Sequence, residues 1–321
     1  MTLIFLLIEL ELEREIYKGE LSNIKNAVLP ILGAVGGMAI PAGIFLILNY
    51  GTSAQAGAGI PTATDIAFAI GILSLLGNRV PGSLKIFLTA LAVIDDLGAI
   101  IIIAVFYTAD LSFQYLLVAL VIFCLLMLCN RLNINNLILY LAGGAVMWYL
   151  MARSGVHPTI TGVLLAFSVP FGDGSERSPS YILQHLLHKL IAFIILPLFA
   201  LANTCISIEN NLIYGLGQNF SLGIIAGLVI GKPLGIWLFS LFGVSTGLCS
   251  LPSNVNWKNI LGIGCLGGIG FTMSIFITLL AYNITDMIDT AKAAILLGSL
   301  IAGTMGFLVL KLTLASPVND D

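Results

Sequence analysis

Long apolar runs separated by short polar segments make up most of the chain. The runs are continuously apolar and lack the alternation of polar and apolar residues that marks a barrel strand, so they predict helices. A helix that crosses a membrane needs roughly 20 apolar residues. We expect about ten such spans, near residues 27–48, 56–76, 84–107, 113–130, 136–152, 157–170, 189–207, 221–245, 259–282 and 289–315. The segment 157–170 is short, and is either a tilted span with borrowed flanks or a partly buried one.

The composition agrees with this pattern, because 59% of the residues are hydrophobic, 9% are charged and the mean hydropathy is +1.06. The formal net charge of −3 is spread over short loops, and no basic block indicates a nucleic-acid partner. The five cysteines show no metal-ligand spacing and are expected to be packing residues. The linkers are short. The predicted protein is therefore an all-α polytopic membrane protein with one integral domain over residues 1–321.

The distribution of basic residues predicts the orientation in the membrane. The loops and the tail on one side hold Arg14, Lys18, Lys25, Arg79, Lys85, Arg131, Arg177, Lys189, Lys258 and Lys311. The opposite loops hold Arg153 alone, while Lys232 and Lys292 lie inside or at the edge of spans. Because cytoplasmic loops carry the excess of lysine and arginine, the segment 12–26 and the C-terminus should be cytoplasmic.

The N-terminal residues 1–26 read as a partial helix followed by a charged segment. MTLIFLLI is apolar up to Glu9, which covers only about a third of the bilayer. The sequence ELELEREIYKGEL that follows is dense in charge. We expect the cytoplasmic end of a helix whose outer half is missing, with residues 1–8 mobile or lying along the interface. An amphipathic surface helix is the alternative.

Two of the predicted spans carry residues that interrupt helices. The span 56–76 holds Gly57, Gly59, Pro61, Thr62 and Thr64, and the span 259–282 holds Gly262, Gly264, Gly267, Gly268, Gly270, Thr272 and Ser274. Such residues in mid-membrane free backbone carbonyls, which is tolerable only around a cavity. A pair of broken spans in the two halves of a transporter indicates its ion site. Close helix packing through small residues is the alternative interpretation.

The order of the spans favours two inverted repeats. If the N-terminal stub counts as the first span, the broken spans are the third and the tenth, and an odd separation makes them enter the membrane from opposite faces. The repeats would cover about 27–107 and 221–315. Broken helices that meet at the midplane bring like dipole ends together. Asp65 could neutralise facing positive ends and Lys232 facing negative ones.

Three aspartates and one lysine are embedded in apolar sequence. Asp65 follows PTAT, Asp95 and Asp96 lie in TALAVIDDLGAIIII, and Lys232 lies in LVIGKPLGI. A charge near the bilayer centre costs at least about 2.5–3.5 kcal/mol, so such residues persist mainly where they bind or carry something. Asp95 and Asp96 are about 100° apart on a helix, so they cannot point equally at one ligand. We expect a pathway for a cation and for protons.

Several long motifs resemble one family of membrane proteins. These are ATDIAFAIGILSLLG, VPGSLKIFLTALAVIDDLGAIIIIAVFYT, IIAGLVIGKPLGI, GIGFTMSIFI, SGVHPTITGV and ILPLFALAN. They look like the NhaA-type sodium/proton antiporters, a family that is a standard example of inverted repeats. The resemblance covers the chain from Leu3 onward. Against the family pattern, the chain keeps about half of the second span and lacks the first, together with the external hairpin between them.

The resemblance implies roles for the embedded residues. Asp96 would be the principal ligand of Na⁺ and of the proton, and Asp95 would be a further ligand able to pair with Lys232. Thr64 and Asp65 would shape the site and balance helix ends. No cofactor is implied beyond the transported Na⁺ and H⁺.

The resemblance also implies a group that senses pH at the cytoplasmic side. Its members here are Glu11, Arg14, Glu15, His185 and His188. Gln184 replaces a carboxylate that the family pattern expects in this group, and Glu13 replaces a basic residue. Without the resemblance, the two histidines would read equally well as a solvated helix entrance.

The predicted function is exchange of cytoplasmic Na⁺ or Li⁺ for external protons by alternating access, in the bacterial inner membrane, with a role in pH and sodium homeostasis. A truncated, inactive antiporter homologue is the main alternative. A homodimer is possible, although the hairpin that pairs protomers in the family is absent. An enzyme is not expected. A prenyl-transfer enzyme would need a further acid near Asp95 and Asp96, an intramembrane aspartyl protease would leave Lys232 unexplained, and a passive channel needs no paired broken helices.

Overall fold

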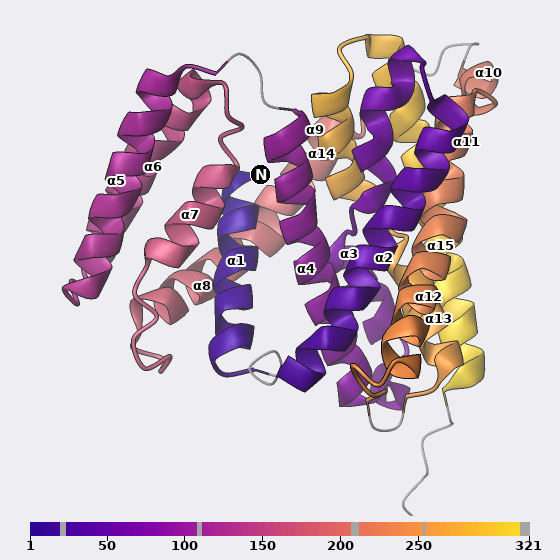
Figure 1. Cartoon of the computed structure of the whole chain (residues 1–321), viewed down its shortest axis with the longest axis horizontal. Coiled ribbons are helices and arrows are strands. Elements are labelled where there is room, and N and C mark those ends of the chain that lie inside the picture. Colours follow the sequence, from indigo (N-terminus) through magenta and orange to yellow (C-terminus); the bar gives the residue numbers. More distant parts are fainter. Residues whose placement is uncertain (20–23, 108–110, 207–211, 253–254, 315–321) are drawn as a thin grey trace, which may run out of the picture. The chain divides into compact units, whose positions relative to one another are not determined.

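Helices form the whole of the regular structure that the computed structural model describes, which covers residues 1–19, 24–107, 111–206, 212–252 and 255–314 (Figure 1). Eight helical segments there are long and apolar enough to cross a membrane, or nine if a bent pair counts as one span. The prediction of an all-α polytopic membrane protein is therefore confirmed.

The chain divides into two compact units, residues 1–22 with 100–201 and residues 23–99 with 202–321. The helices of the first unit are α1 (Thr2–Tyr17), α5 (Phe113–Arg131), α6 (Leu137–Ser154), α7 (Ile160–Ser168), α8 (Pro179–Leu190), the π-helical turn η4 (Ile191–Ile195) and most of α9 (Leu196–Asn203). The helices of the second unit are α2 (Ile24–Asn49), the 3₁₀ helices η2 (Ser53–Thr62) and η3 (Gly77–Arg79), α3 (Ile66–Ser74), most of α4 (Gly82–Phe106), α10 (Leu212–Leu216), α11 (Asn219–Ala226), the π-helical turn η5 (Gly227–Gly231), α12 (Lys232–Ser245), α13 (Trp257–Gly267), α14 (Phe271–Ala281) and α15 (Thr285–Thr313). The single-domain expectation stays a prediction.

In the first unit, α1 packs in parallel against α7. A Cβ added to Gly162 of α7 would lie 2.4 Å from the carbonyl oxygen of Thr2, and the rings of Tyr17 and Phe171 are 5.0 Å apart at the other end. Residues 4–10 of α1 are buried. The expectation that residues 1–8 are mobile or lie along the interface is therefore wrong for residues 4–8, which are packed inside the unit, whereas Leu3 is exposed.

The predicted span 157–170 contains only a short helix. Its helix α7 has nine residues and lies between Pro158 and Pro170. A residue before proline is biased away from helical geometry, and Val169 is indeed extended. Of the two interpretations offered by the sequence, the partly buried segment fits, since six of its nine residues are buried.

In the second unit, α2 and α12 run antiparallel and touch backbone to backbone. A Cβ on Gly36 would lie 2.2 Å from Gly235 O, and a Cβ on Gly235 would lie 2.1 Å from Gly36 O. Only residues without a side chain permit this reciprocal contact. The helix α2 is followed by the broken segment η2–α3 and then by α4, and α11–α12 is followed by the broken segment α13–α14 and then by α15. The first helices of these two sets run in opposite directions, as inverted repeats require.

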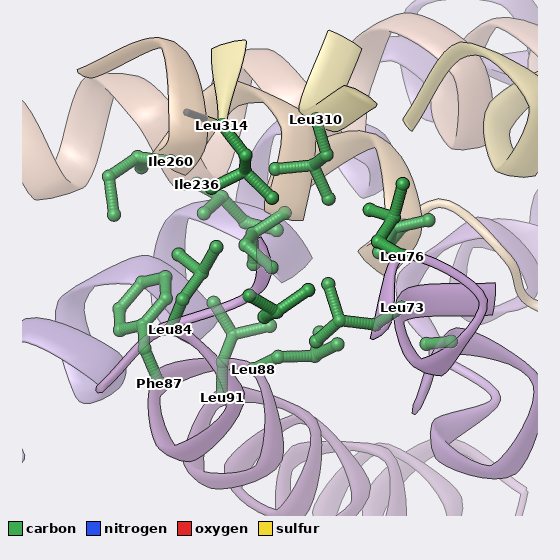
Figure 2. Packing of buried hydrophobic residues seen from close by; sticks show 14 of the residues in the cluster. Leu73, Leu76, Leu84, Phe87, Leu88, Leu91, Ile236, Ile260, Leu310 and Leu314 are labelled. Atoms are coloured by element: carbon green, nitrogen blue, oxygen red, sulfur yellow. The ribbon is translucent and has the colours of Figure 1, made fainter. Parts of the chain in front are cut away.

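The apolar core of the second unit lies where α3, α4, α12, α13 and α15 meet. Leu84, Leu88 and Leu91 come from α4, while Ile236 and Leu310 come from α12 and α15 (Figure 2). All five are fully buried. This core fixes the end of α4 that precedes Asp95 and Asp96 against the helix that carries Lys232.

Two π-helical turns interrupt otherwise regular helices, and each is followed by a proline at the same offset. Pro197 comes two residues after η4, and Pro233 two residues after η5. A proline inside a helix lacks the N–H donor and clashes with the carbonyl four residues earlier. In both cases that carbonyl belongs to the π-turn, which makes room for the ring. The turn η5 thereby sets the direction in which Lys232 leaves its helix.

Candidate ion-binding site

The two predicted broken spans are broken in the structure and cross each other. The first changes from η2 to α3 across residues 63–65, and the second bends by 47° between α13 and α14. At the crossing, the backbone N–H of Asp65 donates to Ile269 O at 2.6 Å. The hydroxyl of Ser274 donates to Ile60 O at 2.7 Å. Hydrogen bonds therefore join the two interrupted segments directly.

Asp65 faces the amino ends of two helices at once. Its side chain caps α3 by accepting from the backbone N–H of Phe68 at 3.2 Å. It also accepts from the backbone N–H of Thr272 at 3.1 Å and from the Thr272 hydroxyl, at the start of α14. A carboxylate stabilises the positive end of a helix dipole. Asp65 therefore compensates the positive ends of both half-helices, as the sequence suggested that it could.

Lys232 lies on the opposite side of the crossing, at the carboxyl ends. The hydroxyl oxygen of Thr64 lies 2.8 Å from the carbonyl oxygen of Gly267, where α13 ends. The ammonium group of Lys232 donates to that hydroxyl oxygen at 2.6 Å and forms an ion pair with Asp95. Cations are favourable at the carboxyl ends of helices. Thr64 and Asp65 are therefore neighbours in the chain that serve different helix ends. Thr64 contacts Lys232 and the carboxyl end of α13, whereas Asp65 contacts the amino ends of α3 and α14.

Asp95 has two oxygens in different environments. Its Oδ2 is held by Lys232 and lies 2.7 Å from the hydroxyl oxygen of Thr64. Its Oδ1 is buried and has no hydrogen-bond partner among the described residues. The side chains of Asp95 and Lys232 are both completely buried, and Asp96 is 1% exposed. A buried oxygen without a donor is where a proton or a small cation would be stabilised.

The donor set is therefore made of hard oxygen atoms. The carboxylate oxygens of Asp95 and Asp96 and the Thr64 hydroxyl are ligands of the kind that alkali cations favour. No group of three or more histidine, cysteine, aspartate or glutamate side chains that could hold a metal occurs in the described part of the chain.

The five residues that the resemblance assigned to pH sensing lie in the first unit, on α1 and α8. Glu11 Oε1 lies 3.7 Å from His188 Nδ1. The Arg14 guanidinium lies 5.1 Å from the centre of the Tyr181 ring, and the His185 ring stacks on the same tyrosine with ring centres 6.2 Å apart. The Glu15 carboxylate lies beside Gly19, just past the end of α1. The structure thus brings together Glu11 with His188, and Arg14 with His185 through Tyr181.

Sequence reasoning missed the roles of Thr272 and Ser299. The backbone N–H groups of Gly270 and Phe271 each donate to the Ser299 hydroxyl at 3.2 Å, so Ser299 and Asp65 together satisfy the first amides of α14. The sequence shows that Thr272 follows a glycine-rich break. It does not show that Thr272 bonds to Asp65, because nothing local indicates which carboxylate lies beside it.

Crossed broken helices with buried, compensated charges at the crossing define a secondary transporter built on inverted repeats. A family model described as Na+/H+ antiporter 1 matches residues 1–310. The chain is 65% identical over 321 residues to a Na(+)/H(+) antiporter NhaA of Flavobacterium psychrophilum, an alignment that covers 100% of this chain and 84% of that relative. This chain belongs to the Na+/H+ antiporter 1 family.

Two further relatives carry the same name. The protein from Cytophaga hutchinsonii is 58% identical over 321 residues, covering 100% of this chain and 83% of its own length. The protein from Salmonella arizonae is 48% identical over 320 residues, covering 99% of this chain and 82% of its own length. The resemblance stated from the motifs is therefore confirmed.

Proposed function

We propose that this chain exchanges Na⁺ for protons across a membrane at a site formed by Asp95 and Asp96, with Lys232 as the counter-ion. The observation that carries the proposal is the divided environment of Asp95, in which Lys232 holds one oxygen and the other is buried without a partner among the described residues. Membership of the Na+/H+ antiporter 1 family supports the same two transported ions.

Competition for these carboxylates converts binding into exchange. A buried carboxylate favours a bound proton or a bound cation over its bare ionised form. Asp96 is the principal ligand in this proposal, and Asp95 contributes while Lys232 balances its charge. Thr64 supplies a further oxygen. If only the proton-loaded and the Na⁺-loaded forms switch between the two faces, each ion that leaves on one side is exchanged for the other.

Asp65 keeps the crossing intact in this mechanism. The positive ends of α3 and α14 face each other and would repel without an anion between them. Asp65 accepts hydrogen bonds at both ends. Its role is therefore to hold the half-helices and Thr64 in position, and a neutral residue there should weaken the site.

The surroundings of the site belong to the same proposal. We place the protein in the bacterial inner membrane, surrounded by lipid, with Li⁺ as a second substrate and with Glu11, Arg14, Glu15, His185 and His188 as the pH-sensing group. The cytoplasmic C-terminus and a homodimer stay predictions, and residues 315–321 lie outside the described residues. An inactive homologue is not favoured, because the whole chain matches a protein named as an antiporter at 65% identity.

The direct test is Asp96→Asn in everted membrane vesicles. This change keeps the size of the side chain and removes its charge, so Na⁺-dependent proton movement should be lost while the protein still inserts. Asp173→Asn, the same change at an exposed loop residue, is the control and should leave exchange intact. Normal exchange by Asp96→Asn protein of wild-type yield would remove Asp96 from the role of principal ligand.

A further inference from the structure

Glu9 is buried where the sequence suggested the start of a charged, water-facing segment. Its side chain is 0% exposed, and neither carboxylate oxygen has a hydrogen-bond partner among the described residues. Glu13 lies one helical turn further on and is 7% exposed, and its Oε2 is buried without a hydrogen-bond partner among the described residues. The ion-exchange mechanism uses neither residue. These two carboxyl groups therefore need their own explanation.

Both carboxyl groups lie on the stripe of α1 that faces α7. Thr2, Leu6, Glu9 and Glu13 follow one another at helical spacings of four, three and four residues, which places them on one side of the helix. Gly162 of α7 meets the backbone of Thr2 and Leu6. At the far end of the same stripe, Tyr17 meets Phe171. Since the helices run in parallel between these two contacts, Glu9 and Glu13 face the C-terminal half of α7.

That half of α7 offers no charge to balance a carboxylate. The segment Ile160–Ser168 contains no titratable residue, and Leu165, Ala166 and Val169 there are buried apolar residues. The hydroxyl of Ser168 is bonded to Leu164 O within its own helix.

The charged groups near α1 lie on another face. Glu11 is two residues from Glu9, about 200° around the helix, and it points toward α8. The titratable and charged groups of α1 and α8 outside the buried pair are Glu11, Arg14, Glu15, Tyr17, Tyr181, His185, His188 and Lys189. Within this set, Glu11 contacts His188 and Arg14 contacts Tyr181, both between α1 and α8, and Tyr181 stacks on His185 within α8. No ion pair to Glu9 is formed within the described ranges.

A carboxylate without a partner is costly in such a place, whereas a neutral carboxylic acid costs far less. Glu13, a second poorly partnered buried carboxyl group one helical turn further on, adds a cost of the same kind if it is ionised. We propose that Glu9, with Glu13 beside it, is a proton-binding site of the first unit, distinct in its residues from the aspartate–lysine site. Its ligand is the proton, which is bound while α1 packs on α7.

The consequence is a pH-dependent contact between α1 and α7. The folded protein holds a proton on Glu9 that the unfolded chain, with an ordinary glutamate, releases near neutral pH. Where the folded state binds more protons than the unfolded state, stability falls as pH rises. Loss of the proton should therefore loosen α1, which also carries Glu11 and Arg14 toward α8.

The test compares the purified full chain with Glu9→Gln, an uncharged residue of the same shape. Thermal unfolding is followed from about pH 5 to about pH 9, the range over which an ordinary glutamate is already ionised. Wild-type protein should lose several degrees more across this range than Glu9→Gln. Glu176→Gln, an exposed loop residue, removes the same charge and should follow the wild type. Infrared spectra should show the C=O stretch of a protonated carboxylic acid at neutral pH that disappears in Glu9→Gln.

An unchanged infrared band together with parallel stability curves would show that Glu9 is ionised in the folded protein, and the proposal would be wrong. Glu9→Leu provides a second comparison, since a protonated Glu9 predicts that an apolar residue of similar size is also tolerated and also flattens the curve. If both variants fail to fold while Glu176→Gln folds, an ionised Glu9 is required, and the proposal is equally overturned.

Discussion

At the scale of single residues, the Lys232–Asp95 ion pair offers the sharpest energetic test. Both side chains are completely buried. Removing one partner of a buried pair leaves an uncompensated charge and costs about 3–5 kcal/mol. We therefore expect Lys232→Ala to lower the stability of the detergent-solubilised protein strongly, and the double variant with Asp95→Asn to recover part of the loss. Unfolding midpoints of the four proteins give the coupling energy.

Lys258→Ala is the control for this cycle, because Lys258 is an exposed lysine at the start of α13. It should leave the midpoint nearly unchanged. If the penalties of Lys232→Ala and Asp95→Asn simply add, the two groups do not interact in the folded protein, and Lys232 loses its role as counter-ion.

The sequence predicted which residues carry the buried charges, but not all of their partners. Asp65, Asp95 and Lys232 stood out because charge inside an apolar run is rare. Thr272 did not, because a threonine in a helix usually bonds to its own backbone. In the sequence, Glu9 marks the end of an apolar run, and its burial by a neighbouring helix leaves no local sign. Charge is visible in a sequence, whereas the surface that covers it comes from tertiary packing.

At the scale of elements, the contact between α2 and α12 makes a strong prediction about glycine. Gly235→Ala would place a Cβ 2.1 Å from the backbone oxygen of Gly36, and backbone cannot rotate away as a side chain can. We expect a lower yield of folded protein and a lower unfolding temperature. Gly43→Ala is the control on α2, because nothing lies within 4 Å of an added Cβ there. That variant should be neutral or slightly more stable, since alanine favours a helix by up to about 1 kcal/mol.

Equal stability of Gly235→Ala and Gly43→Ala would mean that α2 and α12 do not approach as closely as described. Fluorescence-detected size exclusion of membrane extracts at increasing temperatures ranks the two variants without purification.

Element boundaries were predictable where the chain itself interrupts a helix. The breaks at 63–65 and near Gly268 were predicted because glycine, proline and threonine act on the backbone locally. The nine-residue length of α7 was not, because its apolar run continues past the helix and the flanking Pro158 and Pro170 set its ends. The π-turns were not predicted either, although Pro197 and Pro233 are their evident cause.

At the scale of the whole molecule, the distribution of lysine and arginine predicts which loops face the cytoplasm. Asn135 lies in the exposed segment between α5 and α6, and Asn283 in the exposed segment between α14 and α15. We expect Asn135→Cys to react with a membrane-impermeant thiol reagent only in everted vesicles, and Asn283→Cys to react in intact cells. The background should carry serine at the five native cysteine positions. The reversed pattern would contradict the orientation.

The membrane class could be predicted from composition alone, since few arrangements bury so many apolar runs. The inverted-repeat pattern followed from the spacing of the two breaks along the chain. The division into two compact units was not predicted, because two of the boundaries between the units fall inside the helices α4 and α9 and not in loops. One unit holds the crossed helices with the aspartates and Lys232, and the other holds the groups assigned to pH sensing.

The reciprocal glycine contact has a mechanical consequence. Two backbones that touch with nothing between them cannot move closer and leave little room to slide, so Gly36 and Gly235 form a pivot. Displacement then grows with distance from it: Asn49 lies about 20 Å along α2, where a tilt of about 10° moves the helix by about 3.5 Å. Asn49 Nδ2 contacts Asn219 O at 3.4 Å at that end. Distances between spectroscopic labels placed on α2 and α12 should therefore vary most at the ends of this helix pair and least at its glycines. The pivot of the pair thus lies next to Lys232.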